Sequence, residues 1–199
     1  LPVDMEECFI DLLCVPGHKG LMGPSGTGVL MVGKGVEVES LMEGGTGSLS
    51  ESVEQPPFMP DKLESGTLNV PGIAGLKAGL EFITEVGLST IRQHEQKLTK
   101  LLLDGLSELD NVLVYGPKDP NRTVGVVSAV VRGMDPAQVS ALLDREYGIA
   151  TRPGLHCAPL AHKSIGSFET GTVRFSVGYF NTEEEIEKAV QAMKHIAKQ

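Results

Sequence analysis

Residues 16–28 read PGHKGLMGPSGTG and follow directly on the apolar run FIDLLCV at residues 9–15. An apolar run of that length bounded by Pro and Gly predicts a buried strand, and GVLMV at residues 28–32 predicts a second one. The glycines permit positive φ and a close approach of backbone to a flat ligand. We therefore expect Lys19 to be desolvated, which favours its neutral amine. A neutral amine is the nucleophile that forms a Schiff base.

Two other interpretations of this stretch stand beside the Schiff-base lysine. One is a surface turn after a strand, in which Lys19 has no special role. The physics of the motif alone favours this interpretation about as much as the Schiff-base lysine. The other is a phosphate-binding loop of the type GxxxxGK[ST]. That pattern places its lysine after the glycines, whereas Lys19 precedes them, so the phosphate loop is disfavoured.

Composition and charge narrow the class of protein. The 199 residues carry a net charge of −9, which argues against a nucleic-acid partner. No apolar run is long enough to span a membrane. The three cysteines match no zinc spacing, so we expect no metal site. Cys8 and Cys14 lie in an apolar stretch and are expected to be buried. Without a disulfide framework, a reducing cytoplasm is the default location.

The hydrophobic pattern predicts a mixed α/β chain in two parts. Helices are expected over residues 72–86, 88–109, 136–147 and from 183 onward, and strands over residues 112–115, 125–131, 149–152 and 171–177. Asp135 is a good N-cap, and Thr182 with Glu185 forms a capping box. Residues 34–69 lack a regular pattern. We expect residues 1–86 to finish one domain and residues 87–199 to form a small α+β domain.

Four motifs in order resemble one enzyme group: PGHKGLMGPSGTGVL (residues 16–30), ESGTLN (64–69), RPGLHCA (152–158) and VRFSVGYFNT (173–182). They are similar to those of the class V, fold-type I pyridoxal-phosphate enzymes, the cysteine desulfurase and selenocysteine lyase group. The resemblance covers essentially the whole chain. It implies that residues 1–86 are the C-terminal portion of the large cofactor-binding domain and that residues 87–199 are the small C-terminal domain.

The resemblance implies a role for the residues of the first two motifs. Lys19 would carry pyridoxal 5'-phosphate as a Schiff base and later move protons at the substrate α-carbon. His18 would help to hold the cofactor phosphate. Thr67 matches a residue that reaches the phosphate of a partner subunit, which implies a homodimer. Pro16 stands where the group usually has Ser or Thr, so one hydroxyl toward the phosphate is lost.

The last two motifs would bind the substrate and take up its sulfur. Arg174 matches the arginine that grips the substrate carboxylate, for which a bidentate guanidinium is well suited, and Arg152 is a weaker candidate for the same region. Cys157 matches the loop cysteine that attacks the substrate sulfur and becomes a persulfide. His156 could assist its deprotonation. The plainer interpretations are a surface ion pair for Arg174 and a buried structural thiol for Cys157. His162 is expected in a short loop without a partner.

The implied reaction converts the small-molecule substrate cysteine to alanine and delivers sulfur as a persulfide, and it implies a sulfur-acceptor protein as a partner. Cys157 precedes Arg174 by 17 residues, which resembles the members whose compact loop depends on such a partner. The alternatives are a class V aminotransferase, a selenocysteine or cysteine sulfinate lyase, and a non-catalytic oligomerisation or regulatory fragment.

The first residues of the sequence indicate whether the chain is a whole protein. The chain opens with LPVD, without an initiator methionine or a signal peptide, and is expected to be a fragment. The group also needs an aspartate at the pyridine nitrogen and an aromatic or histidine that stacks on the ring, and both precede the lysine strand. Asp4 and Asp11 do not stand in that setting. The chain alone is therefore predicted to be inactive.

Overall fold

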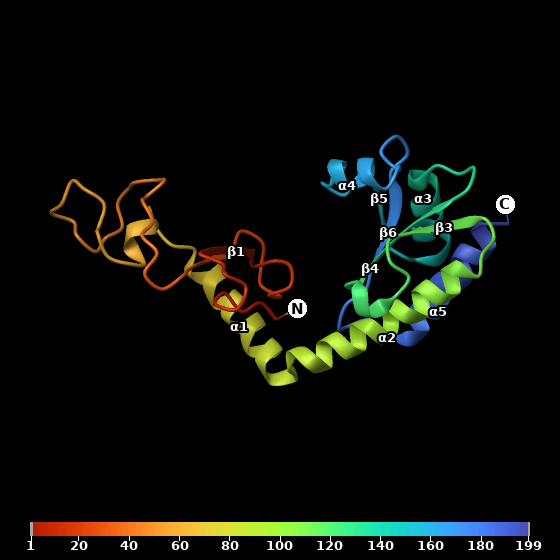
Figure 1. Cartoon of the computed structure of the whole chain (residues 1–199), viewed down its shortest axis with the longest axis horizontal. Coiled ribbons are helices and arrows are strands. Elements are labelled where there is room, and N and C mark those ends of the chain that lie inside the picture. Colours follow the sequence, from red (N-terminus) through yellow and green to blue (C-terminus); the bar gives the residue numbers. More distant parts are fainter. Residues whose placement is uncertain (1, 199) are drawn as a thin grey trace. The chain divides into compact units, whose positions relative to one another are not determined.

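The computed structural model describes residues 2–198. These residues form two compact units that divide between Leu88 and Ser89 (Figure 1). Each unit has its own secondary structure and is described by itself. No helix within residues 2–198 is long and apolar enough to cross a membrane.

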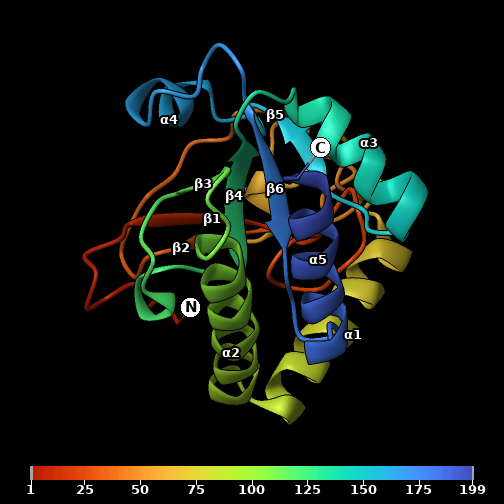
Figure 2. The same ribbon diagram turned by 90° about the vertical axis from the view of Figure 1, so that its right-hand side faces the viewer.

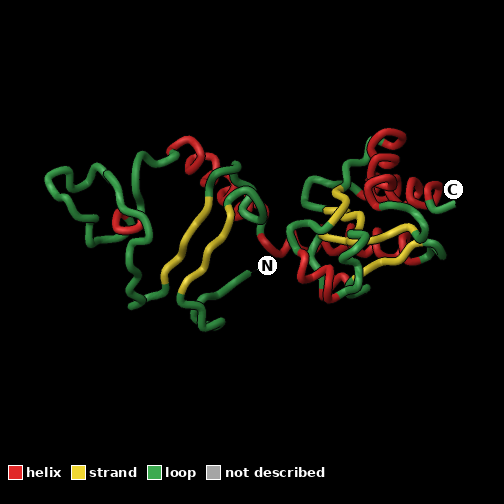
Figure 3. Tube along the Cα trace, turned by 90° about the horizontal axis from the view of Figure 1, so that it is seen from above, coloured by secondary structure: helices red, strands yellow, loops and turns green. Residues whose placement is uncertain are grey.

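The first unit contains a two-stranded antiparallel sheet and one long helix. Its elements are β1 (Leu12–Pro16), β2 (Gly28–Val32), the short 3-10 helix η1 (Asp61–Leu63) and α1 (Val70–Val86). Figure 3 shows β1 and β2 side by side. The two strands that the sequence predicts are present, but burial alternates along β1. The expectation of buried thiols is wrong, because both Cys8 and Cys14 are exposed. An alternating strand in a two-stranded sheet covers one face only.

The turn between β1 and β2 packs closely on α1. Within the turn, Gly17 N–H donates to the Thr27 carbonyl at 2.8 Å and Gly23 N–H donates to the Gly17 carbonyl at 2.8 Å. A Cβ at Gly79 of α1 would lie 2.5 Å from the Leu21 carbonyl oxygen. The backbones of turn and helix therefore meet where only glycine fits.

The second unit is an α+β structure around one antiparallel sheet. Its elements are α2 (Leu88–Ser107), β3 (Val112–Tyr115), η2 (Pro120–Arg122), β4 (Val126–Val131), α3 (Pro136–Tyr147), β5 (Arg152–Gly154), α4 (Pro159–Ser164), β6 (Thr172–Ser176) and α5 (Glu183–Ile196). The strand order is β3-β4-β6-β5. Figure 2 shows α2, α3 and α5 beside the sheet, and α4 set apart from them at the upper left.

Helices α2, α3 and α5 bury one face of this sheet in a single apolar cluster. The cluster includes Leu98 and Leu102 of α2, Leu143 of α3 and Met193 of α5, all at most 1% exposed. Strand residues alternate between the two faces, so Val173 points into the cluster and its neighbours in β6 point to the other face. We call that other face, which carries Arg174, the free face of the sheet.

The helix caps and most element positions agree with the sequence predictions. The Asp135 carboxylate accepts from Ala137 N–H at 2.7 Å, and Thr182 and Glu185 form the predicted capping box. Two local predictions differ. Strand β5 begins at Arg152 rather than spanning residues 149–152, and α4 was not predicted at all.

Candidate active site

Lys19 and His18 lie in the turn that follows β1, and both are exposed. The expectation of a desolvated lysine is wrong for this chain. The turn packs on α1 through Leu21 to Gly23, which leaves its first residues on the outer side. No hydrogen bond or ion pair within residues 2–198 involves the Lys19 amine, and a Cβ at Gly20 would meet nothing within 4 Å. The Lys19 side chain is therefore exposed, and its amine is unpaired among the described residues.

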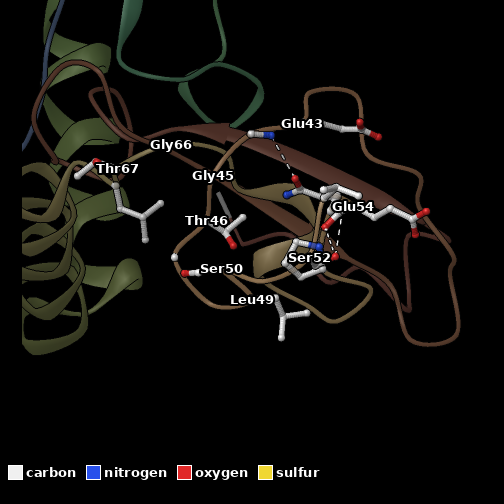
Figure 4. Close-up of a pocket in the computed structure, with 15 residues that line it drawn as sticks. Glu43, Gly45, Thr46, Leu49, Ser50, Ser52, Glu54, Gly66 and Thr67 are labelled. Carbon is white, nitrogen blue, oxygen red and sulfur yellow. Dashed lines mark hydrogen bonds between the residues drawn. The ribbon is translucent and has the colours of Figure 1, made fainter.

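Thr67 lies elsewhere in the first unit, on the border of a hollow of about 840 Å³ formed by residues 43–56 and 66–68. Figure 4 shows Thr67 on one side of this hollow and Glu54 on the other. The Gln55 side chain bonds backbone groups at three positions around this hollow. Gln55 accepts from Gly44 N–H at 3.2 Å and donates to the carbonyls of Asp61 at 2.9 Å and Glu64 at 2.8 Å. The irregular segment thus has a definite local structure.

Three polar residues form a row across the free face of the second unit's sheet. Arg174 of β6 stands directly opposite Arg152 of β5 and Ser128 of β4. Cross-strand neighbours point to the same side of a sheet, so the two guanidinium groups share one face. Like charges placed opposite each other repel, and an anion bound beside them would remove that repulsion.

Arg174 has an unused donor at this place. Its Nε is buried and has no hydrogen-bond partner within residues 2–198. A buried donor without a partner costs free energy, and a bound acceptor would offset that cost. A surface ion pair for Arg174 is not supported, because no salt bridge among the described residues includes it.

Cys157 is exposed and lies directly beside Arg152. Arg152 Nη2 donates to Cys157 Sγ at 3.4 Å. The contact places a guanidinium group directly beside the sulfur atom that would act as the nucleophile. Cys157 (φ +60°) and its neighbour His156 (φ +54°) both adopt the left-handed region. Two consecutive non-glycine residues in that region are unusual and need support from their surroundings. The exposed thiol does not fit a buried structural cysteine.

His156 lies between the arginines and α4. Its Nε2 bonds to the Arg152 carbonyl oxygen at 2.7 Å. Burial lowers the pKa of His156 below 6.5; the bond to the Arg152 backbone opposes this, and charge on Arg174, His162 and Arg152 adds to it. His156 is therefore neutral at pH 7. A carbonyl oxygen only accepts, so the proton of neutral His156 is on Nε2.

His162 is not the loop residue without a partner that the sequence suggested. It lies in α4 and is 4% exposed. Its Nδ1 is hydrogen-bonded to Ser167 Oγ at 2.8 Å, and its ring lies 5.4 Å from that of His156. The sequence did not predict this buried histidine because α4 is only six residues long. A helix so short shows no repeating hydrophobic pattern from which burial could be predicted.

The structure thus groups the predicted site residues in two sets. Lys19 and His18 share the turn of the first unit, while Arg152, Cys157 and Arg174 share the free face and adjoining loop of the second. Thr67 also belongs to the first unit, where it lines the hollow.

Comparison with known proteins identifies relatives of the whole chain. The family model described as Aminotransferase class-V matches residues 1–189. A probable cysteine desulfurase of Methanothermobacter thermautotrophicus is 39% identical over 202 residues, which cover 99% of this chain and 50% of that protein. A cysteine desulfurase of Yersinia pestis is 35% identical, over 99% of this chain and 48% of its own length. The chain spans about half the length of the curated relatives it matches.

Solved structures agree with the sequence relatives. The apo structure of a cysteine desulfurase from Thermococcus onnurineus NA1 matches with a TM-score of 0.82 and 34% identity, covering 98% of this chain and 48% of its own. The cysteine desulfurase CsdA from Escherichia coli matches with a TM-score of 0.82 and 27% identity, covering 100% of this chain and 49% of its own. The fold is that of the C-terminal part of a fold-type I enzyme.

Proposed function

Because the chain belongs to the class V aminotransferase family, we propose that it supplies the cofactor lysine and the sulfur-accepting cysteine of a pyridoxal-phosphate-dependent cysteine desulfurase. The observation that carries the proposal is the contact between Arg152 Nη2 and Cys157 Sγ, beside a register-paired Arg174 whose Nε has no partner within residues 2–198. This arrangement combines a nucleophilic sulfur with donors for a carboxylate, which are the two things an amino acid that carries sulfur requires.

The first unit fits the cofactor through the chemistry of its donors. Lys19 offers an unpaired primary amine in open space and would form the covalent bond to the cofactor aldehyde. His18 beside it would contact the phosphate. Pyridoxal phosphate would supply an electron sink for bond cleavage at the substrate. Lys19, once released by the substrate amine, would move a proton at the substrate α-carbon.

The second unit would hold and desulfurate the substrate. Arg174 would bind the carboxylate in a bidentate manner. The Cys157 thiolate would attack the sulfur of the substrate, so that a new S–S bond forms as the substrate C–S bond breaks. The carbon left behind takes up a proton and leaves as alanine. Cysteine and the Cys157 thiol thereby give alanine and a Cys157 persulfide, with atoms and electrons balanced.

Two further parts of the proposal concern assembly. Thr67 would reach the cofactor phosphate of a second subunit, which would make the enzyme a homodimer. The persulfide on an exposed cysteine would pass to a sulfur-accepting protein or small thiol.

The test uses the native protein with Cys157→Ala and, as matched controls, Cys8→Ala and Cys14→Ala, since all three thiols are exposed. Alanine and sulfide production from cysteine should disappear only in Cys157→Ala. Full activity of this variant would overturn the sulfur-transfer role. Retained activity toward selenocysteine or cysteine sulfinate alone would favour the lyase alternative. Borohydride reduction followed by peptide mass analysis should place the cofactor on Lys19.

A further inference from the structure

A chain of contacts runs from the buried Ser167 to the exposed Cys157. Ser167 is 1% exposed and bonds His162 through both its hydroxyl and its backbone, with Ser167 N–H donating to the His162 carbonyl at 2.9 Å. The His162 ring contacts the His156 ring at 5.4 Å and a 47° tilt. His156 bonds the Arg152 carbonyl, and the Arg152 side chain bonds Cys157 Sγ.

The backbone of the cysteine loop needs such support. His156 and Cys157 both have positive φ, a conformation in which the Cβ of an L-residue is crowded. The loop is joined to α4 by the His162 N–H, which donates to the Ala158 carbonyl at 3.1 Å. A strained segment persists only where the surroundings fix it, and the rings of His162 and His156 form the contact that the helix supplies to the loop.

We propose that His162 is a positioning residue for Cys157: through its ring contact it fixes His156, and through His156 and Arg152 it fixes the thiol. The inference rests on the proposed role of Cys157 as the sulfur acceptor. His162 itself touches no reacting atom. Its bond to Ser167 sets the ring orientation, and its burial prevents other rotamers.

Electrostatics support the same arrangement. The charged or titratable groups that face His156 are Arg152 on β5, Arg174 on β6 and His162 on α4. Together with burial they lower the pKa of His156, which keeps the ring neutral, with its Nε2–H donating to the Arg152 carbonyl. Removing His162 exposes the His156 ring and removes one of these neighbours, so the pKa of His156 should move up toward 6.5.

Two variants separate the ring contact from the polar bond. His162→Asn keeps an amide that can bond Ser167 but has no ring to place on His156. The double variant His162→Phe with Ser167→Ala keeps a ring and removes both polar partners, which avoids leaving a buried hydroxyl unpaired. Ser164→Ala is the matched control, because Ser164 lies in the same helix, is exposed, and its hydroxyl donates to the Leu160 carbonyl of that helix.

The readout is the rate of Cys157 alkylation by iodoacetamide at pH 7 on the intact native protein, resolved by peptide mass analysis. Cys8 and Cys14 are internal references, because both are exposed and lie in the other unit. His162→Asn should slow Cys157 by about fivefold, the scale on which residues of one contact network are coupled. The double variant and Ser164→Ala should match the wild type, and the reference cysteines should not change.

A second readout is the NMR titration of the His156 ring, whose pKa should rise in His162→Asn and stay in Ser164→Ala. An unchanged Cys157 rate in His162→Asn overturns the inference, and so does an equal loss in the double variant, which would assign the effect to the polar bond. Alkylation requires no turnover. A failure of the desulfurase proposal, seen as cysteine turnover by Cys157→Ala, is therefore distinct from a failure of this one.

Discussion

Gly79→Ala should loosen the turn that carries Lys19, although alanine is the better helix former. Gly79 lies inside α1, where the exchange gains about 1 kcal/mol of helix propensity. The added methyl would lie 2.5 Å from the Leu21 carbonyl oxygen and 2.8 Å from the Met22 carbonyl. Overpacking costs about 1–3 kcal/mol, and we take the upper end because the obstructing atoms are backbone. The net expectation is a loss of about 2 kcal/mol.

The assay is hydrogen exchange at the turn amides of Gly17 and Gly23, whose hydrogen bonds close the turn. A loss of about 2 kcal/mol should accelerate their exchange about 30-fold if it acts on local opening. Gly75→Ala is the matched control in the same helix. There the new methyl meets only the ring carbons of Pro24 at 3.1 Å, which can move by the few tenths of an ångström required.

Unchanged or slower exchange in Gly79→Ala would refute the packing argument, and so would equal acceleration in Gly75→Ala. If Lys19 holds the cofactor, Gly79→Ala should also weaken pyridoxal-phosphate uptake, followed by absorbance. Loss of uptake without faster exchange would show that the effect does not come from the turn.

Four further substitutions have expected outcomes, three in the second unit and one in the first. Arg174→Lys should lower kcat/KM for cysteine by about 10–100-fold, chiefly through KM, because lysine keeps the charge but loses a bidentate bond of about 1.5–3 kcal/mol. Arg152→Lys should act chiefly on kcat through its contact with Cys157, and equal KM effects from both variants in steady-state kinetics would contradict these roles. Gln55→Ala should speed amide exchange at Gly44 about fivefold, since it removes a bond of about 1 kcal/mol; no change would mean that the segment is held otherwise. Finally, the pKa of His156 is lower in the folded chain than in the unfolded chain. Below pH 6.5 the unfolded chain therefore binds a proton at this residue more readily than the folded chain does. The free energy of unfolding should consequently fall as the pH is lowered. His156→Gln should reduce that slope in denaturation series between about pH 7.5 and 5.5, and an unchanged slope would assign it to other groups.

Local signals in the sequence predicted the helices of the second unit well. The capping box at Thr182 and the Asp135 cap depend only on neighbours two or three residues apart, and such signals can be read without the tertiary structure. Helix α4 has no side-chain N-cap bond and only six residues. A helix so short does not repeat its hydrophobic pattern, so packing rather than propensity forms it.

Burial in the first unit could not be predicted in the same way. An apolar run at residues 9–15 is compatible with a strand covered on one face or on both. The structure alternates along β1 and leaves Cys14 exposed. The environment of Lys19 follows from how the turn meets α1, and that contact depends on Gly79, sixty residues further along the chain. Periodicity within one element carries no information on it.

The candidate site has the same division between local and distant information. The sequence motifs identified Lys19, Arg174 and Cys157 as candidate site residues. They did not show that Arg174 stands opposite Arg152, because that pairing depends on the sheet register. Register is set by the hydrophobic pattern of the whole sheet. Because of that pairing, Arg152 lies next to Arg174 on the sheet while its side chain also contacts the Cys157 thiol. His162 shows the same effect more strongly. Its only signal in the sequence was its position five residues after Cys157, whereas its burial, its bond to Ser167 and its contact with His156 all arise from the return of the chain between β5 and β6. Residues that position a nucleophile need no fixed spacing from it, because the fold rather than the sequence motif brings them into contact.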